Sequence, residues 1–183
     1  MAAGIPSTTS GIRPGWPGQV DRLSTLFGWI SAGMIVVSVL ITCQMIFVRA
    51  VLGQSTVWQT ELVTYLMVAA TLLGLPYVQK LRGHVNVDLI PLMLRRGPRK
   101  ALAIVTLSAS MLIIAVMLFY GFEFWHKAWA RNWKSETIWA VRLWIPYAAV
   151  PAGLGMLLLQ LAADLWATIN GTDKPFNIAE EKD

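Results

Sequence analysis

The chain has 183 residues, of which 56% are hydrophobic and only 14% are charged, and its formal net charge is +5. This length suits one small domain, and so apolar a composition is typical of an integral membrane protein rather than of a soluble enzyme. The basic residues flank apolar stretches, a pattern that orients membrane proteins, so a nucleic-acid partner is not expected.

Four apolar stretches of 18 to 23 residues follow one another, and none of them contains Asp, Glu, Lys or Arg. A helix of about 20 residues crosses the hydrocarbon core of a bilayer. The sequence therefore predicts an all-α membrane protein with four transmembrane helices. The predicted stretches are Leu26–Val48, Leu62–Gln79, Ala101–Phe122 and Leu143–Ala163.

These stretches predict a transmembrane domain over residues 23–168, between a disordered tail at 1–22 and a second tail at 169–183. The connection between the second and third stretches carries six basic residues against one acid, Asp88. By the positive-inside rule, this connection and both tails are expected to lie in the cytoplasm. Cys43 is the single cysteine and is expected to be a small buried apolar side chain in the first helix.

Several polar residues cluster where the first hairpin should turn outside the membrane. Arg49 ends the first stretch, and Trp58, Glu61 and Tyr65 follow on one face of the second at i, i+3 and i+7. A carboxylate near hydrocarbon is a functional candidate, and an Arg49–Glu61 ion pair would satisfy both charges. A structural pair is the leading interpretation, while proton or ion coupling and a contact with a partner subunit remain open.

A short segment after Gly83 is too short to span the membrane and is followed by basic residues. Residues 85–94 are half apolar, so we expect an amphipathic segment that lies in the membrane interface between the second and third helices. His84 and Asp88 stand at i, i+4, a spacing that allows a local hydrogen bond to fix this segment. The candidate residues here are Gly83, His84, Val85, Val87 and Asp88.

Tryptophans lie at the predicted helix ends, as in the aromatic belts that contact membrane lipids. The third helix is expected to continue beyond the membrane, because Trp125, Trp129 and Trp133 recur every four residues. Docking of an outside partner and anchoring in the interface are both open for this Trp-rich segment. Pro146 and Pro151 predict that the fourth helix begins properly only after Pro151.

Close packing is predicted where small residues recur at four-residue spacing, as in Ala70 with Gly74 and Ala149 with Gly153. Glu123 and Asp164 stand near helix ends, where their side chains should reach water, and no role is assigned to them. Only two histidines are present, on opposite membrane surfaces in this topology, which excludes a shared haem. The sequence predicts no catalytic residue, metal or other cofactor.

The order of these motifs resembles the small membrane subunit of tripartite ATP-independent periplasmic (TRAP) transporters over residues 24–168. The first block runs from Arg49 through Trp58-x-x-Glu61-Leu62-x-x-Tyr65 to Leu73-Gly74. The second is Gly83-His84-Val85-x-Val87-Asp88. The third is Leu143-Trp144-Ile145-Pro146, followed by Pro151-x-Gly153.

The resemblance implies a sodium-coupled importer of organic acids, in which this subunit scaffolds a large polytopic membrane subunit. A periplasmic substrate-binding protein would deliver the cargo. Gly74, Pro146, Pro151 and Gly153 are then expected to shape packing against the large subunit. We predict that Glu61→Ala or Asp88→Ala lowers assembly or uptake. A self-sufficient four-helix exporter acting as an oligomer, or a membrane assembly factor, is the alternative.

Overall fold

A computed structural model of the chain describes residues 15–81 and 96–170. The helices are α1 (Trp16–Leu52), α2 (Val57–Lys80), α4 (Arg96–Ala130), the single turn α5 (Trp144–Tyr147) and α6 (Ala149–Ile169). Four spans within these ranges are long and apolar enough to cross a membrane. The all-α membrane class is thus confirmed. The predicted interfacial segment at 85–94, with Gly83, His84, Val85, Val87 and Asp88, lies outside the described residues.

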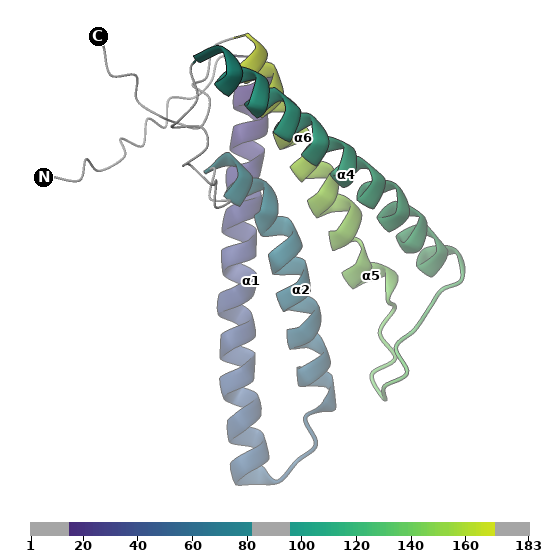
Figure 1. Cartoon of the computed structure of the whole chain (residues 1–183). Coiled ribbons are helices and arrows are strands. Elements are labelled where there is room, and N and C mark those ends of the chain that lie inside the picture. The colour runs from purple at the N-terminus through teal and green to yellow at the C-terminus, as the bar shows by residue number, and fades with distance from the viewer. Residues whose placement is uncertain (1–14, 82–95, 171–183) are drawn as a thin grey trace, which may run out of the picture.

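Helix α6 forms the centre of the arrangement. It packs against α2 and α4 and more lightly against α1, whereas α4 packs mainly against α6. In the most apolar part of the last span, 44% of the residues are buried, compared with 6% in the corresponding parts of α1 and of α4. Figure 1 shows that the α1–α2 pair and the α4–α6 pair diverge toward one end of the molecule, where α1 connects to α2 and α4 connects to α5. We call that end the hairpin end and the opposite one the terminal end.

The first helix is longer than its apolar stretch. It begins at Trp16, with Pro17 in its first turn, and ends at Gly53, which has φ +60°. Residues 16–22 are therefore helical, which corrects the expected boundary of the tail. Proline is favourable at this position because the first turn needs no amide donor, and glycine accepts left-handed backbone without strain.

The break in the fourth span also differs from the prediction. It falls at Ala148, between α5 and α6, and Pro151 lies inside the first turn of α6. Pro151 has no amide hydrogen to donate to the carbonyl of Tyr147, four residues earlier. Ala148 keeps right-handed helical angles, φ −60° and ψ −23°, so the interruption is confined to one residue.

Small residues bring the helices into close contact. A Cβ atom added at Gly28 would lie 2.5 Å from Tyr77, and one at Gly74 would lie 2.9 Å from the Ser31 hydroxyl. Ser31 itself donates a 2.6 Å hydrogen bond to the carbonyl oxygen of Ala70. The α1–α2 contact is therefore a seam of small side chains, as predicted for helices packed in lipid.

Gly153 forms the corresponding contact between α6 and α2. A Cβ atom there would lie 2.5 Å from the carbonyl oxygen of Leu72. That carbonyl would ordinarily accept from residue 76, but Pro76 has no amide hydrogen to donate. Gly74 and Gly153 thus pack against other helices of this chain, and their expected influence on packing against a large subunit stays a prediction.

Candidate functional site

Glu61 joins the start of α2 to the loop between α4 and α5. The Tyr65 hydroxyl donates a 2.6 Å hydrogen bond to one carboxylate oxygen of Glu61, and the Thr137 hydroxyl donates to the other. Ser135 and Thr137 share a hydroxyl–hydroxyl contact of 3.0 Å. We call Glu61, Tyr65, Ser135 and Thr137 the Glu61 cluster. The expected shared face of Glu61 and Tyr65 is confirmed.

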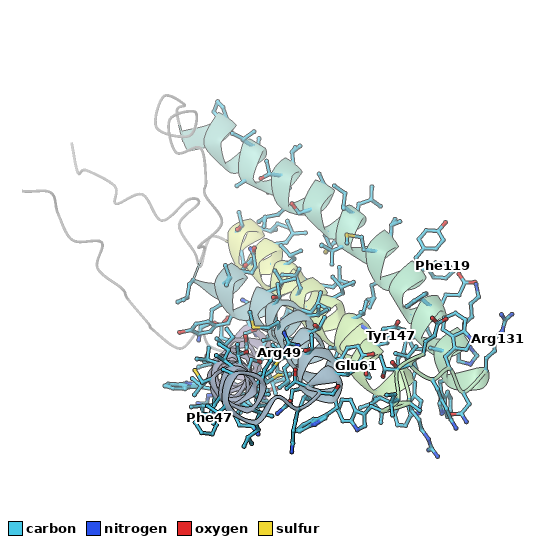
Figure 2. All side chains as sticks on the ribbon, turned by 90° about the horizontal axis from the view of Figure 1, so that it is seen from below. Phe47, Arg49, Glu61, Phe119, Arg131 and Tyr147 are labelled. Carbon is cyan, nitrogen blue, oxygen red and sulfur yellow. The ribbon has the colours of Figure 1, made fainter. Side chains whose placement is uncertain are left out.

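Arg49 does not pair with Glu61, which corrects the predicted ion pair. The Arg49 guanidinium donates a 3.0 Å hydrogen bond to the Thr56 hydroxyl, within the α1–α2 connection. The loop between α4 and α5 supplies hydroxyl donors to the carboxylate instead. Sequence reasoning missed Thr137 because it lies 76 positions from Glu61 along the chain. Figure 2, which views the molecule from the hairpin end, labels the side chains of Arg49 on α1 and Glu61 on α2.

The 131–143 loop has a hairpin-like structure that presents Thr137. The Ser135 amide donates to the Val141 carbonyl at 2.9 Å, and the Leu143 amide donates to the Trp133 carbonyl at 2.9 Å. Ala140 has a left-handed φ of 47°, which is unusual for a residue other than glycine. Trp139 follows Ile138 at the tip and contacts Trp58 edge to face, with ring centroids 6.1 Å apart. The loop is therefore held to α2 both by the hydrogen bond from Thr137 to Glu61 and by the aromatic contact between Trp139 and Trp58.

The Trp-rich segment is helical only in part. Helix α4 continues to Ala130, so Trp125 and Trp129 lie on it and stack with ring centroids 5.8 Å apart. Trp133 belongs to the loop and contacts Phe124 at 5.9 Å. Among the described residues, the sequence interpretation of a continuous aromatic edge thus holds for two tryptophans and ends before the third.

A second polar cluster is buried near the terminal end, among α1, α2 and α6. The Gln160 amide nitrogen donates to the carboxylate of Asp21 at 3.0 Å and approaches that of Asp164 at 3.4 Å. The Ser24 hydroxyl donates to the side-chain oxygen Oε1 of Gln160 at 2.6 Å, and the Gln79 side-chain amide donates to the Asp164 carboxylate at 3.0 Å. We call these five residues the Gln160 cluster.

The Gln160 cluster corrects the assignment of Asp164 to a water-exposed helix end. Asp164 is only 3% exposed, and Ser24 and Gln160 are fully buried. Sequence reasoning missed the cluster, although Gln160 and Asp164 stand at i, i+4 in an otherwise apolar helix. Buried polar groups need partners, so this spacing was the available signal.

Neither cluster has the composition of a metal centre among the residues that the structure describes. In the part of the chain that the structure describes, no three His, Cys, Asp or Glu side chains lie close enough to hold a metal ion. The hydrogen bonds of both clusters connect different elements of the chain. The arrangement therefore fixes helices and a loop relative to one another.

Within the described residues, four helices long and apolar enough to cross a bilayer, joined by hydrogen bonds between buried polar side chains, define a polytopic integral membrane protein. Residues 38–171 match the family model described as "Tripartite ATP-independent periplasmic transporters, DctQ component". The chain belongs to this family, the small permease subunits of TRAP transporters, and is a multi-pass protein of the bacterial inner membrane.

The chain is also similar to a Vibrio cholerae protein named as a C4-dicarboxylate TRAP transporter small permease protein, DctQ. The two are 22% identical over 153 residues, which covers 72% of this chain and 66% of the relative. The aligned part of the chain thus spans just under two thirds of the relative's length.

Proposed function

We propose that this chain is the stationary scaffold of a sodium-driven importer of organic acids. In this proposal a large polytopic subunit carries cargo and sodium, and a periplasmic binding protein delivers the cargo. Both termini face the cytoplasm, as the distribution of basic residues suggests. Membership of the small-permease family supports the proposal, and it favours a subunit over a self-sufficient exporter.

One observation carries the scaffold role. The buried polar side chains of the Gln160 cluster hydrogen-bond to one another across three helices. An apolar groove lies along α2 beside α5 and the start of α6, and Tyr65 is the one hydroxyl-bearing residue among those that line it. Sodium and carboxylates need several oxygen ligands or hydrogen-bond donors, which such a groove does not supply. These features suit a scaffold subunit better than a subunit that carries the cargo.

The candidate residues take structural roles in this proposal. Glu61, Trp58 and Arg49 organise the corner of the protein that faces the periplasm. His84, Val85, Val87 and Asp88, with Gly83, organise the segment at the cytoplasmic interface. Pro146 and Pro151 set the path of the last span.

Reconstitution with one component omitted at a time tests the proposal. Vesicles receive this chain, the large subunit and the binding protein, together with an inward sodium gradient. The name of the Vibrio cholerae relative makes succinate, a C4-dicarboxylate, the first cargo to test. We expect uptake only when all three proteins are present. Sodium-dependent transport by this chain alone would support the exporter instead.

A further inference from the structure

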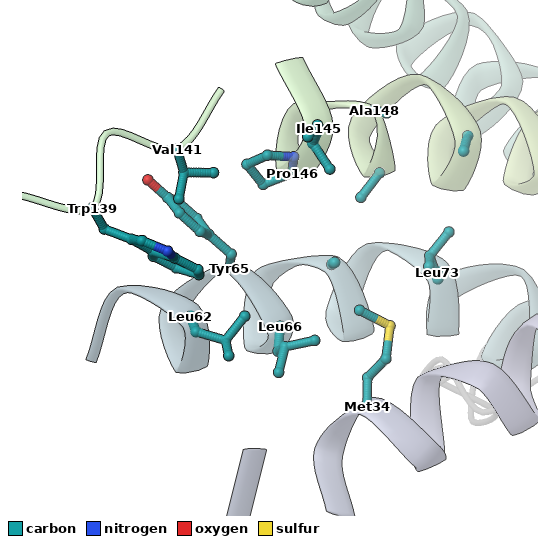
Figure 3. Close-up of a pocket in the computed structure, with 13 residues that line it drawn as sticks. Met34, Leu62, Tyr65, Leu66, Leu73, Trp139, Val141, Ile145, Pro146 and Ala148 are labelled. Atoms are coloured by element: carbon teal, nitrogen blue, oxygen red, sulfur yellow. The ribbon is translucent and has the colours of Figure 1, made fainter. Parts of the chain in front are cut away.

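An apolar groove of about 490 Å³ runs along α2 beside α5 and the start of α6. Leu62, Leu66 and Leu73 line one wall, and Ile145 and Pro146 face them from the other. Trp139 and Val141 of the 131–143 loop lie at one end, as Figure 3 shows, and Met34 of α1 lies near the other. The groove therefore begins at the hairpin end and extends into the membrane-spanning part of the protein.

Its dimensions fit one extended hydrocarbon chain. From Leu62 to Leu73 a helix advances about 16 Å. A groove of that length and of about 490 Å³ has a mean cross-section of about 30 Å², which is narrow and suits one hydrocarbon chain. A helix about 10 Å wide and of that length would need more than about 1,000 Å³. An acyl chain fills the groove, whereas a whole partner helix does not fit within it.

A second hollow of about 550 Å³ adjoins the groove at the hairpin end and shares Trp139 with it. Ser55, Val57 and Trp58 line this hollow beside Ile138, which is 97% exposed at the loop tip. Indole rings and a hydroxyl beside apolar side chains are typical of the lipid headgroup level.

A cation is hydrogen-bonded to a residue that lies, in sequence, between two residues of the second hollow. Ser55 and Val57 flank Thr56, whose hydroxyl accepts the hydrogen bond from Arg49. The Arg49 side chain is exposed, and a guanidinium has five N–H donors, so donors remain for an anion. A phosphate is the group that arginine binds best at a membrane surface.

We propose that this chain binds one glycerophospholipid, with an acyl chain in the groove and the phosphate at Arg49. The site goes beyond the scaffold role, because it needs neither the large subunit nor a cargo. Contact with a groove of fixed shape distinguishes this lipid from the lipids that surround the other helix faces, which exchange freely. The bound lipid fills the space that α5 and the 131–143 loop leave beside α2.

Native mass spectrometry of the full purified chain tests the acyl-chain site. We expect one dioleoyl phosphatidylglycerol to stay bound per chain after detergent has removed the surrounding lipids. Ala152 lines the groove, so Ala152→Phe should weaken retention about tenfold, a loss of about 1.4 kcal/mol. Ala109→Phe, on an exposed position of α4 away from the groove, is the matched control and should retain the lipid. Equal retention by both variants, or none by the unmodified chain, would overturn the proposal.

The headgroup is tested separately. Arg49→Gln should lower retention of phosphatidylglycerol about tenfold, whereas Arg131→Gln, an exposed arginine at the other side of the hairpin end, should not. Dioleoylglycerol, which has no phosphate, should be retained as weakly by the unmodified chain as phosphatidylglycerol is by Arg49→Gln. Equal retention of the two lipids by the unmodified chain would contradict the phosphate contact.

A photo-crosslinking side chain at Leu66 distinguishes a lipid from a protein occupant. In the assembled transporter we expect the crosslink to form to phosphatidylglycerol. A crosslink to the large subunit instead would mean that a protein segment occupies the groove, and the lipid proposal would fail. The scaffold function would then stand unchanged, because reconstituted uptake tests it independently.

Discussion

Individual polar side chains in this protein form hydrogen bonds between elements that are distant in sequence. Glu61 holds the 131–143 loop through Thr137, and Gln160 brings together side chains of α1 and α6. In lipid, a polar group that loses its partner cannot turn to water, so each contact constrains the positions of two elements. Both clusters lie where a polar residue interrupts an apolar face.

Removing the Glu61 carboxylate should loosen the 131–143 loop. Glu61→Ala deletes both acceptors, and a loss of about 1 kcal/mol of stability is expected when half-buried donors lose a charged partner. Thermal unfolding in detergent, followed by circular dichroism, measures this change. Glu136→Ala, an exposed residue of the same loop, is the control and should leave the midpoint within error. If both variants unfold at the same temperature, the Glu61 cluster does not hold the loop.

Gln160 is the second test at this scale. Gln160→Leu keeps the volume of the side chain but removes hydrogen bonds to Asp21 and Ser24, so unfolding should again become easier by about 1–3 kcal/mol. Gln19→Leu changes an exposed glutamine in the first turn of α1 and is the matched control. A Gln160 variant as stable as the original chain would show that the buried cluster contributes no net stability.

Sequence reasoning was most successful with helices and least with contacts. Glu61 and Tyr65 could be placed on one face, because helical spacing is local. The acceptor of the Arg49 guanidinium could not be predicted, because Thr56 and Glu61 both follow it within a dozen residues and only the turn geometry decides between them. Asp164 was assigned to water because its position near a helix end does not reveal that α1 and α2 cover it.

At the scale of helices, glycine and proline act together where α2 meets α6. Pro76 deprives the Leu72 carbonyl of its usual donor, and Gly153 allows α6 to approach that carbonyl. A sequence shows both residues but does not pair them. The same limit applies to helix starts: the apolar stretch marks the part that suits hydrocarbon, whereas α1 begins ten residues earlier, at Trp16.

Adding one methyl group tests this contact. Gly153→Ala places a Cβ atom 2.5 Å from the Leu72 carbonyl oxygen, so α6 must move away from α2. We expect a loss of about 1–3 kcal/mol, the range for overpacking a close contact. Gly155→Ala, two residues along the same helix, meets no atom nearer than 4.0 Å and should be neutral or slightly stabilising. The comparison is made by thermal unfolding, and equal destabilisation of both variants would point to a general helix effect.

The whole molecule is asymmetric in the membrane. Helix α1 has 37 residues, about 55 Å of helix, whereas the hydrocarbon core is about 30 Å thick. The two helix pairs diverge toward the hairpin end and are fastened near the terminal end by the Gln160 cluster. The number of spans followed from hydropathy, but the central place of α6 depends on which small residues face one another. Long helices that are joined by buried hydrogen bonds in this way suit a stationary element against which another subunit moves.

The depth of Cys43 in the bilayer tests that claim most directly. This single cysteine is exposed on α1, which corrects its expected burial, and it accepts a spin label without further substitution. In the assembled transporter, its depth is compared with and without sodium and cargo, alongside a label near the cargo site of the large subunit. We predict that the large-subunit label changes depth while Cys43 does not. If Cys43 moves with the cargo site, this chain travels with the carrier and is not its brace.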